Sequence, residues 1–168
     1  HALTMRPLVL LDRDGVINHD APRGIHHIDD FHFLPRALDA IAMLHDAGFA
    51  IAICTNQSAV GRGWISMQTV DAIHAHMREQ VVQHGGAIDA IYVAPDAPDA
   101  ATSRRKPAPG MLLEALAEFH ANPARTPFIG DALRDMQAAH AAGCVPICVR
   151  TGKGEATMAE GFDAGIGD

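Results

Sequence analysis

Cysteine is scarce in this chain of 168 residues, and its placement excludes a fold held together by disulfides. The three cysteines, Cys54, Cys144 and Cys148, are odd in number, form no CxxC pair and lie within apolar, strand-like runs. Small secreted domains instead carry an even set of cysteines at regular spacings. We therefore expect buried, reduced thiols and a cytoplasmic protein.

Long apolar runs and excess positive charge are also missing. No apolar segment approaches the roughly 20 residues that a membrane-spanning helix needs, and the formal net charge of −7 argues against nucleic-acid binding. We expect neither a nucleic-acid nor a membrane partner, and we expect a monomer. The length suits one domain with a full core, expected over residues 5–153. Residues 1–4 are interpreted as a vector remnant and residues 154–168 as a weakly patterned tail.

Short apolar runs alternate with segments of helical periodicity. The apolar runs predict strands at 8–11, 49–54, 88–93, 127–130 and 145–149. The periodic segments predict helices at about 35–48, 66–84, 111–121 and 133–142. This alternation predicts an α/β fold with a doubly wound, Rossmann-like parallel sheet in three layers. No segment is long enough for a large cap domain, so loops near 18–33, 59–64 and 94–105 are expected to border the site.

Polar side chains follow several of these strands. They are Asp12 and Asp14 after the first strand, Thr55 and Asn56 after the second, Arg105 and Lys106 before the third long helix, and Asp131 after the fourth strand. The carboxyl ends of parallel strands share one edge of a sheet, so we expect these groups to meet in one cleft. Each residue alone also fits a plainer role as a turn, a strand end, a solvated charge or a helix cap.

The charges in this set indicate a chemistry. Two unit charges ~4 Å apart repel by about 4 kcal/mol at an effective dielectric of ~20, so converging carboxylates need a cation. Oxygen ligands suit Mg²⁺. A Mg²⁺ site beside a lysine and a hydroxyl group suits a phosphoryl group.

The same motifs resemble a known family. Asp12-Arg13-Asp14-Gly15, Thr55 to Ser58, Arg105-Lys106-Pro107 and Gly130-Asp131 through Asp135-Met136 resemble the haloacid dehalogenase superfamily phosphatases in order and spacing. The resemblance covers about residues 8–153. The segments 60–63, 106–111, 135–139 and 151–153 are similar to its heptose bisphosphate phosphatase branch.

The resemblance implies roles for these residues. Asp12 is expected to attack phosphorus and form an aspartyl-phosphate. Asp14 is expected to protonate the leaving group and then activate water, which requires a raised pKa when substrate is bound. Thr55 and Lys106 would bind phosphoryl oxygens. The metal ligands would be Asp12, the Asp14 backbone carbonyl and Asp131, with Asp135 behind them. The implied substrate contacts are Arg13, Asp20 to Arg23, Asn56, Gln57, Ser58 and Arg105.

The implied activity is Mg²⁺-dependent removal of the 7-phosphate of D-glycero-D-manno-heptose 1,7-bisphosphate, a lipopolysaccharide precursor. Two alternatives stay open: a phosphatase for histidinol phosphate or another small sugar phosphate, and a non-catalytic phosphosugar-binding protein. The branch typically binds a structural Zn²⁺ through Cys-Pro-His and Cys-x-Cys segments. This chain has Ala94-Pro95-Asp96 and Thr102-Ser103-Arg104 there, so we expect no zinc. Ala132 also replaces a basic residue common after Asp131.

Overall fold

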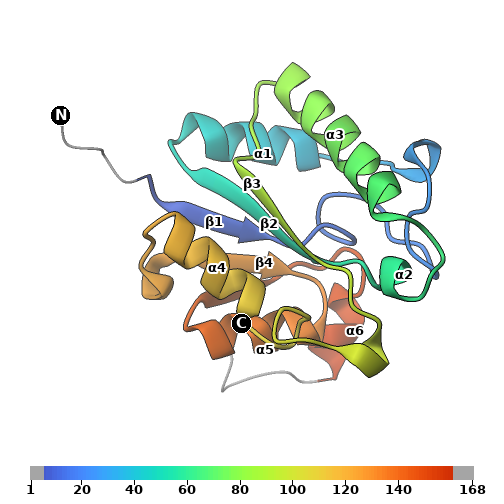
Figure 1. The fold of residues 1–168 in the computed structure, drawn as a ribbon. Helices are drawn as coiled ribbons and strands as arrows, with labels where there is room; N and C mark the ends of the chain where they lie inside the picture. Colours follow the sequence, from blue (N-terminus) through green and yellow to red (C-terminus); the bar gives the residue numbers. More distant parts are fainter. Residues whose placement is uncertain (1–5, 161–168) are drawn as a thin grey trace.

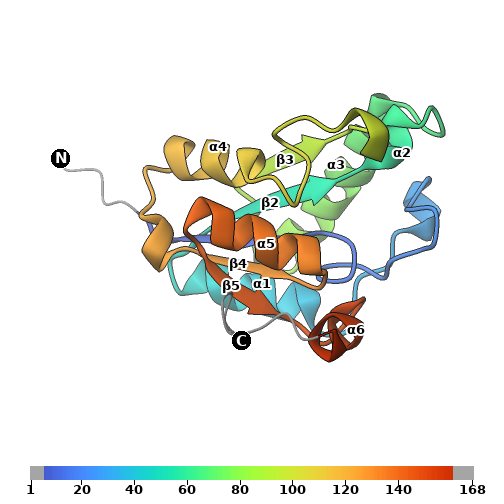
Figure 2. The ribbon, with the colours of Figure 1, turned by 90° about the horizontal axis from the view of Figure 1, so that it is seen from below.

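Strand β1 (Leu8–Leu11) lies at the centre of a five-stranded sheet in the computed structural model, which describes residues 6–160. The other strands are β2 (Ala50–Asn56), β3 (Ala90–Ala94), β4 (Pro127–Gly130) and β5 (Val145–Cys148). All neighbours pair in parallel, in the order β3-β2-β1-β4-β5 (Figures 1 and 2). The predicted doubly wound parallel sheet is confirmed.

Helices cover both faces of this sheet. One face carries α1 (Ala37–Asp46) and α3 (Met67–Gln83), and the other carries α4 (Gly110–Glu118) and α5 (Leu133–Ala142) (Figures 1 and 2). Side chains alternate along β1, so Leu8 and Leu10 join the cluster with α4 and α5, whereas Val9 and Leu11 join the cluster with α1 and α3. A strand buried on both faces reads as an uninterrupted apolar run, which is why β1 was predictable.

Two short α-helices lie where no helix was predicted. Helix α2 (Ser58–Gly61) begins the segment expected to be a loop, and α6 (Gly154–Ala159) lies in the expected tail. Segments this short do not develop a helical hydrophobic period. The proposed vector remnant at 1–4 lies outside the described residues, as do residues 161–168 of the tail.

The sheet has its topological switch point between β1 and β4. The chain moves from β1 through β2 to β3 on one side, and β4 and β5 lie on the other. The registry Leu11↔Ile129 and the bond from Asp12 N to Ile129 O (2.9 Å) set the carboxyl ends of both strands next to each other. Such a crevice is where ligands bind in open α/β sheets. Within residues 6–160 no large cap domain is present, and no helix is long and apolar enough to cross a membrane.

Candidate active site

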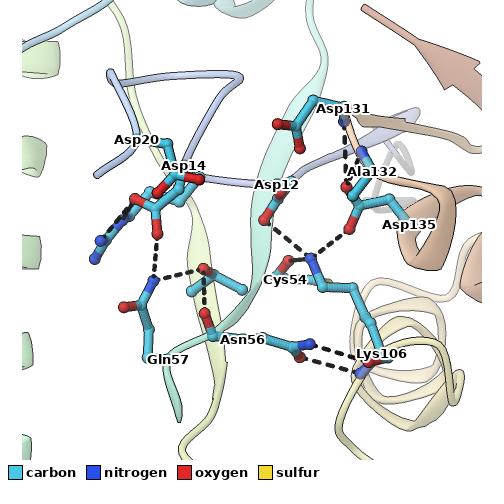
Figure 3. A network of polar contacts seen from close by, with 12 residues as sticks. Asp12, Asp14, Asp20, Cys54, Asn56, Gln57, Lys106, Asp131, Ala132 and Asp135 are labelled. Carbon is cyan, nitrogen blue, oxygen red and sulfur yellow. Dashed lines mark hydrogen bonds and ion pairs between the residues drawn. The ribbon is translucent and has the colours of Figure 1, made fainter. Parts of the chain in front are cut away.

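Three buried carboxylates converge at the switch point. Asp12 follows β1, Asp131 follows β4, and Asp135 stands in the first turn of α5. One oxygen from each lies within 4.8 Å of the others (Figure 3). Three such charges repel strongly at this separation unless cations or protons balance them.

Lys106 supplies one positive charge to this cluster. Its Nζ lies 2.9 Å from Asp12 Oδ1 and 2.7 Å from Asp135 Oδ1, and it donates to the carbonyl of Cys54 at 2.9 Å. Burial alone would lower the pKa of this amine, but Asp12 and Asp135 outweigh burial and raise it. Lys106 is therefore a fixed, desolvated cation.

Asn56 holds the backbone of Lys106 in place. The side-chain amide of Asn56 donates to the Lys106 carbonyl at 3.0 Å, and the Lys106 N–H donates to Asn56 Oδ1 at 3.0 Å (Figure 3). This paired contact joins the end of β2 to the segment before α4. Both the nitrogen and the oxygen of the Asn56 amide are therefore bonded to protein backbone, and its expected role as a substrate contact stays a prediction.

The remaining negative charge fits a divalent cation. Burial, together with the charge of Asp135, raises the pKa of Asp12, and burial likewise raises that of Asp131. The charge of Lys106 overcomes burial at Asp135 and lowers its pKa. Lys106 Nζ donates to Oδ1 of Asp12, and the backbone N–H of Lys153 donates to Oδ2 of Asp131 at 2.8 Å. Among residues 6–160 the second oxygen of each carboxylate has no donor, and two such oxygens are suitable Mg²⁺ ligands.

Asp14 stands apart from the carboxylate cluster, within a set of donors. Asp14 Oδ1 accepts from Arg13 Nε at 2.9 Å and from Asn18 Nδ2 at 2.8 Å. Asp14 Oδ2 accepts from Gln57 Nε2 at 3.1 Å (Figure 3). Burial favours the protonated form, but Arg13 and these hydrogen bonds outweigh it and lower the pKa of Asp14. The raised pKa that we expect with substrate bound stays a prediction.

The loop at residues 151–153, one of the branch-like segments, completes the site by packing against Asp131 and Gly15. Gly15 and Gly152 both have positive φ, 86° and 56°, and a Cβ on either would clash with Asp131 Oδ2. Thr151 Oγ1 donates to Gly15 O, and Thr157 Oγ1 donates to Asp131 O, both at 2.7 Å. The Asp131 carboxylate therefore fits only because residues 15 and 152 are glycines, and α6 holds its backbone carbonyl through Thr157.

A pocket of about 250 Å³ opens beside Asp12. The predicted site residues that line it are Asp12, Asp14, Asp20, Arg23, Asn56, Gln57, Ser58 and Lys106. Trp64 and Arg134 also line it, although the sequence analysis did not single them out, and so do Arg62 and Lys153, which lie in the branch-like segments 60–63 and 151–153 but had no assigned role. Arg23 and Arg62 both stack on Trp64, with 4.4 and 5.0 Å from guanidinium carbon to ring centroid.

Three expected phosphoryl or substrate contacts lie outside this lining. The expectation for Arg13 is corrected, because its side chain is fully buried and bonds to Asp14 and His74. Thr55 is buried, and its hydroxyl accepts from Gln57 Nε2 at 2.9 Å. Arg105 is half-buried and donates to Asp96 O at 3.2 Å. The roles of Thr55 and Arg105 stay predictions.

The 94–105 loop is closed by hydrogen bonds. Asp96 Oδ2 accepts from both the N–H and the hydroxyl of Thr102 at 2.7 Å. These two residues belong to the segments that carry zinc ligands in the family that the motifs resemble. A carboxylate–hydroxyl contact here joins the two ends of the loop directly.

Comparisons with known proteins agree on one family. A family model described as HAD-hydrolase-like matches residues 103–165. The chain is 42% identical over 154 residues to D-glycero-beta-D-manno-heptose-1,7-bisphosphate 7-phosphatase of Bordetella bronchiseptica, covering 92% of this chain and 86% of that protein. Identity to the same enzyme of Pseudomonas aeruginosa is 39%, over 95% and 90% of the two chains.

A solved structure is equally similar. It is the crystal structure of D,D-heptose 1,7-bisphosphate phosphatase from B. bronchiseptica complexed with magnesium and phosphate. Its TM-score to this chain is 0.93 at 40% identity, and the match covers 96% of this chain and 90% of that one.

Proposed function

This chain belongs to the haloacid dehalogenase-like hydrolases, in the family of the heptose bisphosphate phosphatases, and from this membership we propose that it is a Mg²⁺-dependent phosphatase that removes the 7-phosphate of D-glycero-β-D-manno-heptose 1,7-bisphosphate. One observation carries the proposal. Asp12 and Lys106 line one pocket and are paired at 2.9 Å, and an oxygen of Asp131 lies within 4.8 Å of an oxygen of Asp12, so that each of the two carboxylates has an oxygen left for a cation.

We assign the chemistry to two aspartates. Asp12 attacks phosphorus through a carboxylate oxygen, the bond from phosphorus to the sugar oxygen breaks, and Asp14 gives the sugar oxygen a proton. Water then attacks the aspartyl-phosphate, Asp14 takes a proton from the water, and the Asp12 carboxylate is released with inorganic phosphate. The negative phosphoryl group beside Asp14 is expected to raise its pKa and so provide the proton. When bound, Mg²⁺ supplies charge neutralisation at the phosphoryl oxygens.

The positive charge at the pocket supports a substrate with a second phosphate. Burial and the nearby charges of Arg134 and Arg62 lower the pKa of Arg105, so three guanidinium groups are close enough to repel. Within residues 6–160, none of the three forms an ion pair with a carboxylate. Clustered arginines without carboxylate partners suit a further anionic group.

A phosphate-release panel tests this proposal. Both anomers of heptose 1,7-bisphosphate, a heptose 7-monophosphate and histidinol phosphate are compared with and without Mg²⁺. We expect the highest kcat/KM for the β-bisphosphate and no turnover after chelation. A preference for histidinol phosphate would favour that alternative, and binding without phosphate release from any compound would favour a non-catalytic protein. The expectations of a monomer and a cytoplasmic location stay predictions.

A further inference from the structure

Arg13 directs its side chain away from the pocket and into the core beneath α3. The guanidinium is fully buried. Its Nε and Nη2 lie 2.9 and 2.7 Å from Asp14 Oδ1, its Nη1 lies 3.1 Å from His74 Nε2, and its carbon stands 5.7 Å from the centroid of Phe31. A buried guanidinium is costly unless acceptors meet its N–H groups. Among the described residues, Asp14 and His74 are the side chains that accept from it.

His74 is the polar member of an otherwise apolar stripe on α3. The buried residues of this helix are Val70, Ile73, His74, Met77 and Val81. Arginine has only donors, so His74 Nε2 must accept and the imidazole proton resides on Nδ1. Burial and the charge of Arg13 hold the pKa of His74 at about 3, so this acceptor is present throughout the neutral range.

We propose that His74 is a positioning residue for Asp14, acting by fixing the guanidinium of Arg13 that in turn orients the Asp14 carboxylate. The inference rests on the proposed phosphatase function. Arg13 and Asn18 both hold Oδ1, which leaves Oδ2 toward Gln57 and the pocket. Without the acceptor at His74, Nη1 must find another partner, and the long side chain of Arg13 turns the carboxylate with it. Proton transfer tolerates little such rotation, because donor and acceptor must come within roughly 2.6–3.2 Å.

Leaving-group dependence separates positioning from packing. A sugar alkoxide must be protonated as it departs, whereas 4-nitrophenolate is a weak base that departs without a proton. The parameter kcat/KM reports the steps up to loss of the leaving group and therefore isolates the acid role of Asp14. A misoriented Asp14 lowers this parameter for the sugar phosphate but not for 4-nitrophenyl phosphate.

The experiment uses His74→Leu, His74→Gln and the control His76→Leu. His76 stands on the same helix and packs edge-on against Phe31, at 6.3 Å between centroids. We expect His74→Leu to lower kcat/KM for heptose bisphosphate about tenfold, a part of the 10²–10⁴ that general acid–base catalysis contributes. Turnover of 4-nitrophenyl phosphate and inhibition by inorganic phosphate should stay within about twofold, because the nucleophile and phosphoryl site are intact. Glutamine offers an acceptor oxygen, so His74→Gln should recover most of the loss. The control His76→Leu should leave kcat/KM unchanged for both substrates.

Three outcomes would overturn the inference. Equal losses of kcat/KM on both substrates would assign His74 to packing alone. An unchanged kcat/KM for heptose bisphosphate in His74→Leu would show that His74 does not position Asp14. A crystal structure of His74→Leu with Arg13 and Asp14 unmoved would also contradict it, independently of activity. If His74→Leu does not fold, His74→Gln is compared with His74→Ala by the ratio of kcat/KM for heptose bisphosphate to kcat/KM for 4-nitrophenyl phosphate. A wild-type protein that releases phosphate from no substrate would instead overturn the proposed function.

Discussion

The ammonium group of Lys106 donates to Asp12 Oδ1 at 2.9 Å and thereby distinguishes the two oxygens of that carboxylate. Lys106 occupies Oδ1, and among residues 6–160 the other oxygen has no hydrogen-bond donor. A carboxylate fixed in this way cannot rotate freely, so both of its oxygens keep defined positions in the site. This asymmetry is the basis of the first prediction.

Asp12→Asn should lower kcat at least ~10³-fold, because an amide neither attacks phosphorus nor binds Mg²⁺ as a carboxylate does. Steady-state phosphate release measures the loss. Asp39→Asn makes the same change at an exposed position of α1 and should keep wild-type turnover. Near wild-type activity of Asp12→Asn would rule out the covalent route.

Asp14→Asn should retain Mg²⁺ affinity within about threefold while losing turnover, since the expected ligand is the backbone carbonyl and the side chain supplies the proton. Isothermal titration calorimetry with Mg²⁺ measures the affinity. Asp131→Asn should weaken the same binding, because its carboxylate belongs to the buried cluster. A large loss of Mg²⁺ affinity in Asp14→Asn would show that the side chain is a ligand.

Arg62→Ala should raise KM for heptose bisphosphate about fivefold, a modest effect because an exposed guanidinium is screened by water. Its KM for 4-nitrophenyl phosphate, which has no distal anion, should not change. Arg125→Ala, in the segment before β4 and away from the pocket, is the control. Equal effects on both substrates would remove Arg62 from distal recognition.

Purified protein should contain no stoichiometric zinc, because Ala94, Asp96 and Thr102 replace zinc-ligand types in the 94–105 loop. Elemental analysis after expression in zinc-supplemented medium measures this. One equivalent per chain would reveal an unforeseen site.

His74 should make the folded protein sensitive to acid. Its pKa is about 3 when folded against roughly 6.5 in a free chain, so between these values the unfolded chain binds one more proton. The free energy of unfolding therefore falls as the pH falls, by at most about 1.4 kcal/mol per pH unit from this residue, and is unaffected above the higher value.

Urea unfolding at pH 7 and pH 5 measures that contribution. His74→Gln should lose about 2 kcal/mol less than wild type over this interval, since glutamine does not titrate. His140→Gln, at an exposed position of α5, should lose as much as wild type. Equal losses in wild type and His74→Gln would contradict the buried, neutral imidazole.

The sequence predicted the elements whose pattern is local. Four apolar residues in β1 and the spaced stripe on α3 both report burial directly, and polar residues at strand ends predicted the site. The expected substrate contact of Arg13 was wrong, although the sequence also indicates which face of the sheet its side chain takes. Arg13 continues the alternation of Val9 and Leu11 toward the face covered by α1 and α3. Its partner His74 is 61 positions away, and no local pattern links the two.

Contacts made by short or distant segments were not predictable. Helix α6 has only six residues, too few for a periodic signal. Thr157 reaches the carbonyl of Asp131 across 26 positions, which only the folded chain reveals. Sequence patterns thus identified the reacting groups but not the residues that hold them in place.

The two hydrogen bonds between the Asn56 amide and the Lys106 backbone join the end of β2 to the residue whose amine is paired with Asp12. Ser58, two residues after Asn56, lines the pocket. A sugar bound against Ser58 would therefore also affect the position of Asn56 and, through it, of Lys106. A phosphate ester that lacks the sugar should for this reason have a low kcat, because no sugar contact then helps to position Lys106 for the phosphoryl group.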